Sequence, residues 1–305
     1  MQRWWIYQRE RFPVFAHGVL IAAFSLSAVS FSMLLRNDIT APAPTVAAVA
    51  FISCFGFFLL LRIADEFKDF EDDSRYRPYR PVPRGLVSLR ELGWVAVIVV
   101  LLQLAVNLWL HALLLIPLAL AWIYLLLMSV EFFAPGWLKR HPFTYMWSHM
   151  LIMPLIDFYA TACDWIVAGL QVPPAGLYWF LLVSFFNGIV IEIGRKIRAP
   201  QDEEPGVETY SALWGARRAI VAWLAALALT AISAFAAAGW IDFALEAGII
   251  LVVLLVLCIA LAARFLRDRQ TRRAKLIETI SGVWTVLMYL SLGVIPLSLR
   301  LAGVA

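Results

Sequence analysis

Long apolar blocks, separated by short polar stretches, run through nearly the whole chain. Several blocks continue for about 18 to 22 residues, the length of helix that crosses a ~30 Å hydrocarbon core. The apolar stretches do not alternate with polar residues, as the run Val-Ala-Val-Ile-Val-Val at 95–100 illustrates, so helices rather than strands are predicted. The pattern predicts nine membrane-spanning helices, at about 14–35, 45–64, 92–110, 112–132, 143–162, 177–194, 217–240, 242–264 and 280–301.

The composition agrees with a membrane protein. Of 305 residues, 63% are hydrophobic and 15% are charged, and the mean hydropathy is +0.82. Soluble domains carry roughly 25% charged residues. We therefore expect an all-α integral membrane protein whose residues 1–305 form a single polytopic domain, with membrane lipid around it and no nucleic-acid partner.

The basic residues are distributed unevenly between the two sides of the predicted membrane. If successive loops lie on alternate sides of the membrane, 23 of the 25 Lys and Arg residues lie on the same side as the N-terminus. Only Arg36 and Arg300 lie on the opposite side. Because short cytoplasmic loops are enriched in Lys and Arg, the N-terminus and the loops after spans two, four, six and eight are predicted to be cytoplasmic. The high Ala, Leu and Arg content favours a bacterial inner (plasma) membrane.

The loop after the second span is strongly acidic. If the helix of that span continues, Glu66, Asp69 and Asp73 stand at i, i+3 and i+7, on one helical face. Carboxylates that close repel one another unless cations lie between them, and Mg²⁺ typically binds a few carboxylates together with substrate phosphates. A solvated acidic helix end is the alternative. We interpret the cluster as a metal site formed by Asp65, Glu66, Asp69 and Asp73.

The loop after the sixth span again mixes acids with bases. Glu192 and Asp202 are its candidate metal ligands, and Arg195, Lys196 and Arg198 lie between them. Two such clusters suit a diphosphate, since metals bridge its oxygens while basic side chains neutralise the charge on the leaving group. The loops, at about 65–91 and 192–216, lie four spans apart, which suggests an internal duplication of helices 1–4 and 5–8.

These residues resemble the UbiA superfamily of intramembrane prenyltransferases. The first motif of that family reads Asn-Asp-x-x-Asp-x-x-x-Asp, and here Asp65, Glu66, Asp69 and Asp73 stand at its positions. Residues 80–85 read Arg-Pro-Val-Pro-Arg-Gly and match the Arg-Pro-x-Pro-x-Gly tail of the motif. The chain departs from the family in having Asp-Glu for Asn-Asp and in lacking regularly spaced aspartates in the second loop.

The resemblance implies helices around a central cavity, with Mg²⁺ held against an isoprenyl diphosphate and the prenyl tail in a lipid-facing chamber. Loss of pyrophosphate would leave an allylic cation, which a small aromatic or other lipophilic acceptor captures. Lys196 is expected to act on the leaving group as a catalytic residue. The residues expected to bind the diphosphate are Arg9, Arg75, Arg77, Arg80, Arg195, Lys196 and Arg198.

An ionisable residue in the predicted fifth span is a further candidate. His149, Met153 and Asp157 share one face at i, i+4 and i+8, and ionisable groups at membrane depth usually act in a cavity. Asp157 is therefore a candidate catalytic residue that orients an acceptor or takes its proton, with His149 as its partner. An interhelical hydrogen bond is the structural alternative.

Two other functions remain open at this point. A terpene cyclase of the same superfamily would use the same metals without an acceptor. A transporter would carry its charged residues near the bilayer midplane, whereas the acids here cluster at the membrane face.

Overall fold

The computed structural model describes residues 2–304, and every regular element among them is a helix. In the first part of the chain these are α1 (Gln2–Arg11), α2 (Val14–Leu35), α3 (Pro44–Lys68), α4 (Phe70–Tyr76), α5 (Leu89–Leu110), η1 (Ala112–Leu114), α6 (Leu115–Ser129), η2 (Glu131–Phe133) and α7 (Pro135–Arg140). The remainder are α8 (Pro142–Met150), α9 (Ile152–Trp165), α10 (Leu177–Arg195), η3 (Pro200–Asp202), α11 (Tyr210–Trp214), α12 (Ala216–Gly239), α13 (Ala244–Arg267), α14 (Thr271–Leu292) and α15 (Val294–Leu301).

The helices confirm the prediction of a polytopic all-α protein with about nine spans. Within residues 2–304, eight helical segments are long and apolar enough to cross a membrane. The fifth predicted span, at 143–162, is instead divided into the shorter helices α8 and α9, which meet at Leu151. Two other boundaries differ from the prediction, because α3 continues as helix to Lys68 and α14 already begins at Thr271.

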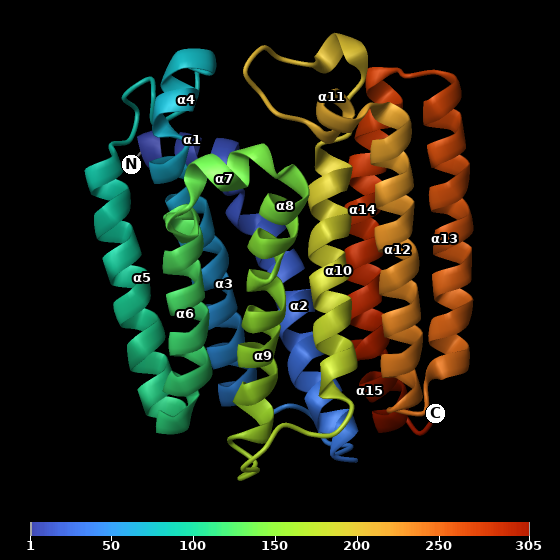
Figure 1. The fold of residues 1–305 in the computed structure, drawn as a ribbon. Helices are drawn as coiled ribbons and strands as arrows, with labels where there is room; N and C mark the ends of the chain where they lie inside the picture. The colour runs from blue at the N-terminus through green and yellow to red at the C-terminus, as the bar shows by residue number, and fades with distance from the viewer. Residues whose placement is uncertain (1, 305) are drawn as a thin grey trace.

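The bundle has a central group of helices and two lipid-exposed edges. In the most apolar 18-residue stretch of each helix, 61% of the residues are buried in α2 and in α10, compared with 22% in α5 and 28% in α13. Figure 1 shows α5 and α13 at opposite edges of the bundle, with α2, α9 and α10 between them. Large apolar side chains such as Ile98 on α5 and Val252 on α13 are exposed, as expected where a helix faces lipid.

Short helices gather at one end of the bundle, which we call the loop end. Figure 1 places α1, α4, α7, α8 and α11 there, whereas α15 and the connection between α9 and α10 lie at the other end. At that opposite end, the Arg36 guanidinium donates to both carboxylate oxygens of Asp164, at 3.0 and 2.8 Å. Ser32 donates to the same carboxylate at 2.7 Å, so α2 and α9 are joined where both helices end.

Hydrogen bonds between buried polar side chains join four helices in the apolar part of the bundle. The Gln103 amide donates to the Ser53 carbonyl at 2.8 Å, and the Asn107 amide donates to the Ser53 hydroxyl at 3.0 Å. Trp122 donates to Gln103 at 3.0 Å, and Tyr159 donates to Asn107 at 2.7 Å. With no water in the hydrocarbon core, these bonds satisfy groups that would otherwise be unpaired and fix α3, α5, α6 and α9 relative to one another.

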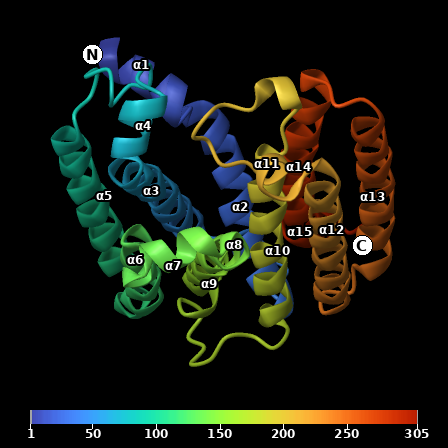
Figure 2. The same cartoon turned by 45° about the horizontal axis from the view of Figure 1, so that its top comes forward.

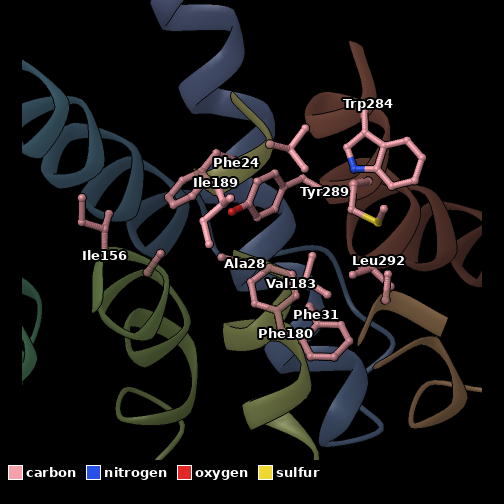
Figure 3. Close-up of a cluster of buried hydrophobic side chains, with 14 of the residues drawn as sticks. Phe24, Ala28, Phe31, Ile156, Phe180, Val183, Ile189, Trp284, Tyr289 and Leu292 are labelled. Carbon is pink, nitrogen blue, oxygen red and sulfur yellow. The ribbon is translucent and has the colours of Figure 1, made fainter. Parts of the chain in front are cut away.

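An aromatic cluster fills the centre between α2, α10 and α14. The ring of Tyr289 meets Phe24 and Phe180 edge-on, with centroids 4.9 and 5.8 Å apart. Phe180 stacks on Phe31 with centroids 4.7 Å apart. These side chains point toward one another (Figure 3), and the packed rings hold three helices in contact.

Gly293, between α14 and α15, lies directly against the backbone of α2. A Cβ at this position would lie 2.2 Å from the carbonyl oxygen of Ser27. Gly282, in the interior of α14, has open space around it, with nothing within 4 Å of the equivalent atom. The close approach of α2 to α14 therefore depends on glycine at position 293.

We predict that Gly293→Ala lowers the stability of the purified protein by about 1–3 kcal/mol, because backbone must move to relieve the overlap. Gly282→Ala is the matched control and should be neutral or slightly stabilising, since Ala is the better helix former by roughly 1 kcal/mol. Thermal unfolding in detergent compares the two variants with wild type. Equal stability of both variants would contradict the close packing of α2 on Gly293.

Candidate functional site

The two acidic segments meet at the loop end. The first continues from the end of α3 through α4, and the second follows α10 and leads through η3 into α11; Figure 2 turns this end toward the viewer. A cavity of about 340 Å³ lies between them, lined by Asp72 and Tyr76 on one side and by Gly206 and Glu208 on the other. Gly206 has φ +75°, and a Cβ there would lie 2.6 Å from the Tyr76 ring. Close contact of the two segments thus requires glycine at this turn.

Glu66 is already paired with a cation inside the protein. Its carboxylate accepts from the Arg11 guanidinium at 2.5 Å, and the Glu66 side chain is 1% exposed. Arg11 ends α1 and Glu66 lies in the last turns of α3, so this ion pair ties the first helix to the acidic segment. Glu66 is therefore primarily a structural partner of Arg11 rather than a metal ligand.

Asp73 is likewise held by basic side chains of its own segment. One carboxylate oxygen accepts from Arg77 at 3.2 Å and the other from Arg80 at 2.5 Å, and the Asp73 side chain is 5% exposed. Arg77 and Arg80 are therefore occupied in positioning the turn after α4. The interaction orders the chain that leads into the Arg-Pro-Val-Pro-Arg-Gly stretch.

Asp65 and Asp69 are the acids of the predicted metal motif that are partly exposed, whereas Glu66 and Asp73 are buried. Asp65 and Asp69 stand at i and i+4 on the continuing helix, and the Asp65 side chain is 40% exposed, with Arg62 at 3.5 Å. Asp69 lies at the joint of α3 and α4. Burial raises the pKa of its carboxyl group above the ordinary value, and the charges of Asp65 and Asp73 add to this rise against the opposing charge of Lys68. A cation bound here would relieve that cost.

In the second segment, Glu192 is held between two cations. Its Oε2 accepts from Arg195 Nη2 at 2.5 Å, and its Oε1 accepts from Lys196 Nζ at 2.8 Å. The Tyr210 hydroxyl approaches Oε1 at 3.5 Å, and the Lys196 ammonium lies 5.5 Å from the centre of the Tyr210 ring. Glu192, Arg195 and Lys196 together carry two positive charges and one negative charge.

The side chains of the two segments lie within electrostatic reach of each other. The charge of Asp65 acts on Arg195, and the charge of Arg62 also reaches this residue. Asp65 and Glu192 both act on His149 of α8. The ends of α3, α8 and α10 therefore surround one polar region at the loop end.

Two residues of this region, Lys68 and Tyr145, were not among the predicted site residues. Lys68 donates to the Tyr145 hydroxyl at 2.7 Å, and the His149 ring stacks on Tyr145 with centroids 4.0 Å apart. Lys68 lies inside the acidic motif, one turn from Asp65, so its position in the sequence could have identified it as a site residue. Tyr145 is 77 residues from Lys68 in the chain, and no pattern in the sequence connects the two.

Other predicted residues lie outside this region or have other partners. Asp202 accepts from the Thr271 hydroxyl at 2.9 Å, at the start of α14, and Arg198 pairs with Glu204 at 3.3 Å. Arg9 and Arg75 are exposed, on α1 and α4. Helix α10 ends at Arg195, and Asp202 lies seven residues later in the separate helix η3, where it bonds to α14 rather than lying beside Glu192.

Asp157 lies in the interior, apart from the polar region. It is fully buried, and one carboxylate oxygen accepts from the Tyr289 hydroxyl at 2.8 Å. The same hydroxyl lies 3.2 Å from Ser184 Oγ, so α9, α10 and α14 are joined. The second oxygen of Asp157 is buried with no hydrogen-bond partner. His149 bonds instead to the backbone of Tyr145 at 2.8 Å, so it is not the partner of Asp157.

The first segment fits a magnesium ion that is completed by substrate. Among residues 2–304, no three His, Cys, Asp or Glu side chains are grouped closely enough to hold a metal by themselves. Mg²⁺ commonly takes one or two carboxylates and fills its remaining positions with phosphate oxygens and water. Asp65 and Asp69, accessible and one turn apart, suit that arrangement.

Comparison with solved structures finds the same fold in several chains, three of which are described next. A digeranylgeranylglyceryl phosphate synthase superposes with a TM-score of 0.62 at 16% identity, over 98% of this chain and 100% of that one. A UbiA homologue from Aeropyrum pernix K1 gives 0.65 at 16% identity, over 88% and 97%. A homologue from Archaeoglobus fulgidus, bound to DMAPP and Mg²⁺, gives 0.58 at 17% identity, over 96% and 99%.

Comparison by sequence identifies the family. Among curated proteins, none matches the chain. The profile of the UbiA prenyltransferase family matches residues 25–282, which include α3, both acidic segments and most of α14. The chain is an integral membrane protein that belongs to the UbiA prenyltransferase family.

Proposed function

We propose that this protein is a Mg²⁺-dependent prenyltransferase that ionises an isoprenyl diphosphate and transfers the prenyl group to an aromatic or other lipophilic acceptor. The observation that carries the proposal is the meeting of two charged segments at one end of a membrane bundle, with Asp65 and Asp69 on one segment and Arg195 and Lys196 on the other. Membership of the family supports the reaction class. The DMAPP and Mg²⁺ bound to the Archaeoglobus homologue support the substrate class and the metal.

The diphosphate is proposed to bind between the two segments. Asp65 and Asp69 would hold Mg²⁺, which would supply positive charge to the diphosphate when bound. Arg195 and Lys196 neutralise the same oxygens from α10, and Lys68 adds a third positive charge from α3. These charges act in a region partly shielded from water, where electrostatic stabilisation is stronger than in bulk solvent.

The reaction starts with cleavage of the bond between the allylic carbon and the diphosphate oxygen. The bonding electrons leave with the diphosphate, where Lys196 and Arg195 stabilise the growing negative charge. The allylic cation then accepts an electron pair from the acceptor, a new bond forms, and the acceptor loses a proton. Asp157, with one unpaired carboxylate oxygen, is the proposed group that orients the acceptor or takes that proton.

The loop end is proposed to face the cytoplasm, with residues 1–305 acting as one polytopic domain. Of the 25 Lys and Arg residues, Arg36 and Arg300 are assigned to the opposite side of the membrane. Figure 1 places the helices that carry the charged segments at the loop end. This charge asymmetry supports a cytoplasmic active site in a plasma membrane of bacterial type.

The function is tested by incubating the purified protein with C10, C15 and C20 allylic diphosphates, with and without Mg²⁺. We expect Mg²⁺-dependent pyrophosphate release that requires an added aromatic acceptor or membrane lipid, with the prenylated acceptor detected by mass spectrometry. Release without any acceptor, accompanied by a cyclic hydrocarbon or alcohol, would instead identify a terpene cyclase. Neither release nor diphosphate binding under any of these conditions would overturn the proposed function.

The metal assignment predicts that Asp69→Asn reduces turnover on the order of 10²-fold or more, as loss of a group that stabilises transition-state charge does. Glu71→Gln is the matched control, because Glu71 is an exposed acid of the same motif and its loss should leave turnover near the wild-type level. Binding of Mn²⁺ in place of Mg²⁺, followed by electron paramagnetic resonance, provides a direct second readout. Undiminished Mn²⁺ binding by Asp69→Asn would exclude Asp69 as a ligand.

The role of Asp157 predicts a loss of transfer without a loss of fold. Asn at this position keeps an oxygen that accepts from Tyr289, so Asp157→Asn should fold and bind the diphosphate normally. Transfer should fall roughly 10²-fold, the lower range for removal of a general base. Tyr289→Phe, which removes the hydrogen bond but keeps the carboxylate, is the control and should retain more activity. Full turnover by Asp157→Asn would leave Asp157 as an interhelical tie alone.

A further inference from the structure

The Glu192 carboxylate has no free side from which a divalent metal can be bound. Arg195 donates to Oε2 through Nη2 at 2.5 Å and through Nε at 2.8 Å. Lys196 donates to Oε1 at 2.8 Å, and the Tyr210 hydroxyl lies 3.5 Å from that oxygen. The Glu192 side chain is 7% exposed. A metal ion at this carboxylate would have to displace both cations or lie beside them, and like charges at such distances repel strongly.

The second segment also lacks a further carboxylate beside Glu192. On a helix, a second ligand on the same face would stand at i+3 or i+4, and these positions hold Arg195 and Lys196. The next acid of the segment, Asp202, is bonded to Thr271 at the start of α14. Residues 192–202 therefore do not fit the metal site that their acid content suggested.

The two segments consequently differ in charge. In the first, Asp65 and Asp69 are two partly exposed acids one turn apart, and the Asp65 side chain is 40% exposed. In the second, Glu192, Arg195 and Lys196 together carry a net positive charge, and the Lys196 and Arg195 side chains are 33% and 46% exposed. The first segment attracts a cation, and the second attracts an anion directly.

We propose that Lys196 and Arg195 take the place of a second metal ion, so that one divalent cation, at Asp65 and Asp69, suffices for the diphosphate. Glu192 is then a positioning residue that aims both basic side chains. The inference rests on the proposed function, because it assigns the contacts of the same diphosphate. Two metal ions, one for each acidic segment, would be the arrangement expected from the motifs alone.

The experiment counts metal ions in the purified full-length protein. Mn²⁺ is titrated in the presence of a saturating, non-ionising thiolodiphosphate analogue of a C10 allylic diphosphate, and bound Mn²⁺ is measured by electron paramagnetic resonance. We expect one Mn²⁺ per bound analogue in wild type. Lys196→Asp, which creates a pair of carboxylates with Glu192 at i and i+4, should raise the count to two.

Two further variants separate the loss of a cation from the creation of a site. Lys196→Met removes the charge at similar length and should weaken analogue binding about tenfold, or ~1.4 kcal/mol, with the count still at one. Lys275→Met removes an exposed charge from α14 and should change neither quantity. Thermal unfolding of each variant shows that it is folded before metal is counted.

Three results would overturn the inference in different ways. Two Mn²⁺ ions per bound analogue in wild type would show that the second segment holds a metal, and the proposed function would stand. No binding of the analogue at any Mn²⁺ concentration would overturn the proposed function and this inference with it. Unchanged analogue affinity in Lys196→Met would exclude Lys196 as a diphosphate contact.

Discussion

The interaction on which the site depends is the pairing of carboxylates with cations at the end of an apolar bundle. A buried carboxylate without a partner is costly, and several of them close together are more so. The structure meets this constraint at Glu66, Asp73 and Glu192, each of which has a basic partner at 2.5 to 2.8 Å. Asp65 and Asp69 remain accessible, so an acidic motif of several residues is reduced to a small site for a cation.

The same ion pairs also determine where the two segments stand. Glu66 and Arg11 join α1 to α3, while the paired arginines at Asp73 fix the turn after α4. Below them, hydrogen bonds of Gln103 and Asn107 hold α3 against α5, α6 and α9. The acidic motif therefore lies on α3, which is held by the Arg11 ion pair at the loop end and by hydrogen bonds in the apolar part of the bundle. This favours a preorganised site.

The sequence predicted those parts of the structure that depend on local patterns. Apolar length located the spans, and helical periodicity predicted Glu66, Asp69 and Asp73 on one face of a continuing helix, whereas α3 ends at Lys68 and Glu66 and Asp73 are paired with arginines. Contacts between distant segments were not predictable in this way: Arg11 reaches Glu66 across 55 residues, and Tyr145 reaches Lys68 across 77. Asp202 is predicted as a metal ligand because it is an acid near Glu192 in sequence, whereas α10 ends at Arg195 and Asp202, in η3, bonds to Thr271. The assignment of residues 1–305 to a single domain and the duplication of helices 1–4 and 5–8 stay predictions.

The charge difference between the segments has a consequence for ionisation. In the proposed site, a diphosphate between an acidic α3 and the basic end of α10 would be held on one side through a metal and on the other by Lys196 and Arg195. Negative charge that develops on the leaving group then meets side chains already fixed by Glu192, so little reorganisation accompanies cleavage. Asp157 and the aromatic side chains around Tyr289 lie in the apolar interior, away from this charge. Because the acceptor must reach the carbon that the diphosphate leaves, Asp157 would have to act on it from the interior side of that carbon, opposite the charged groups.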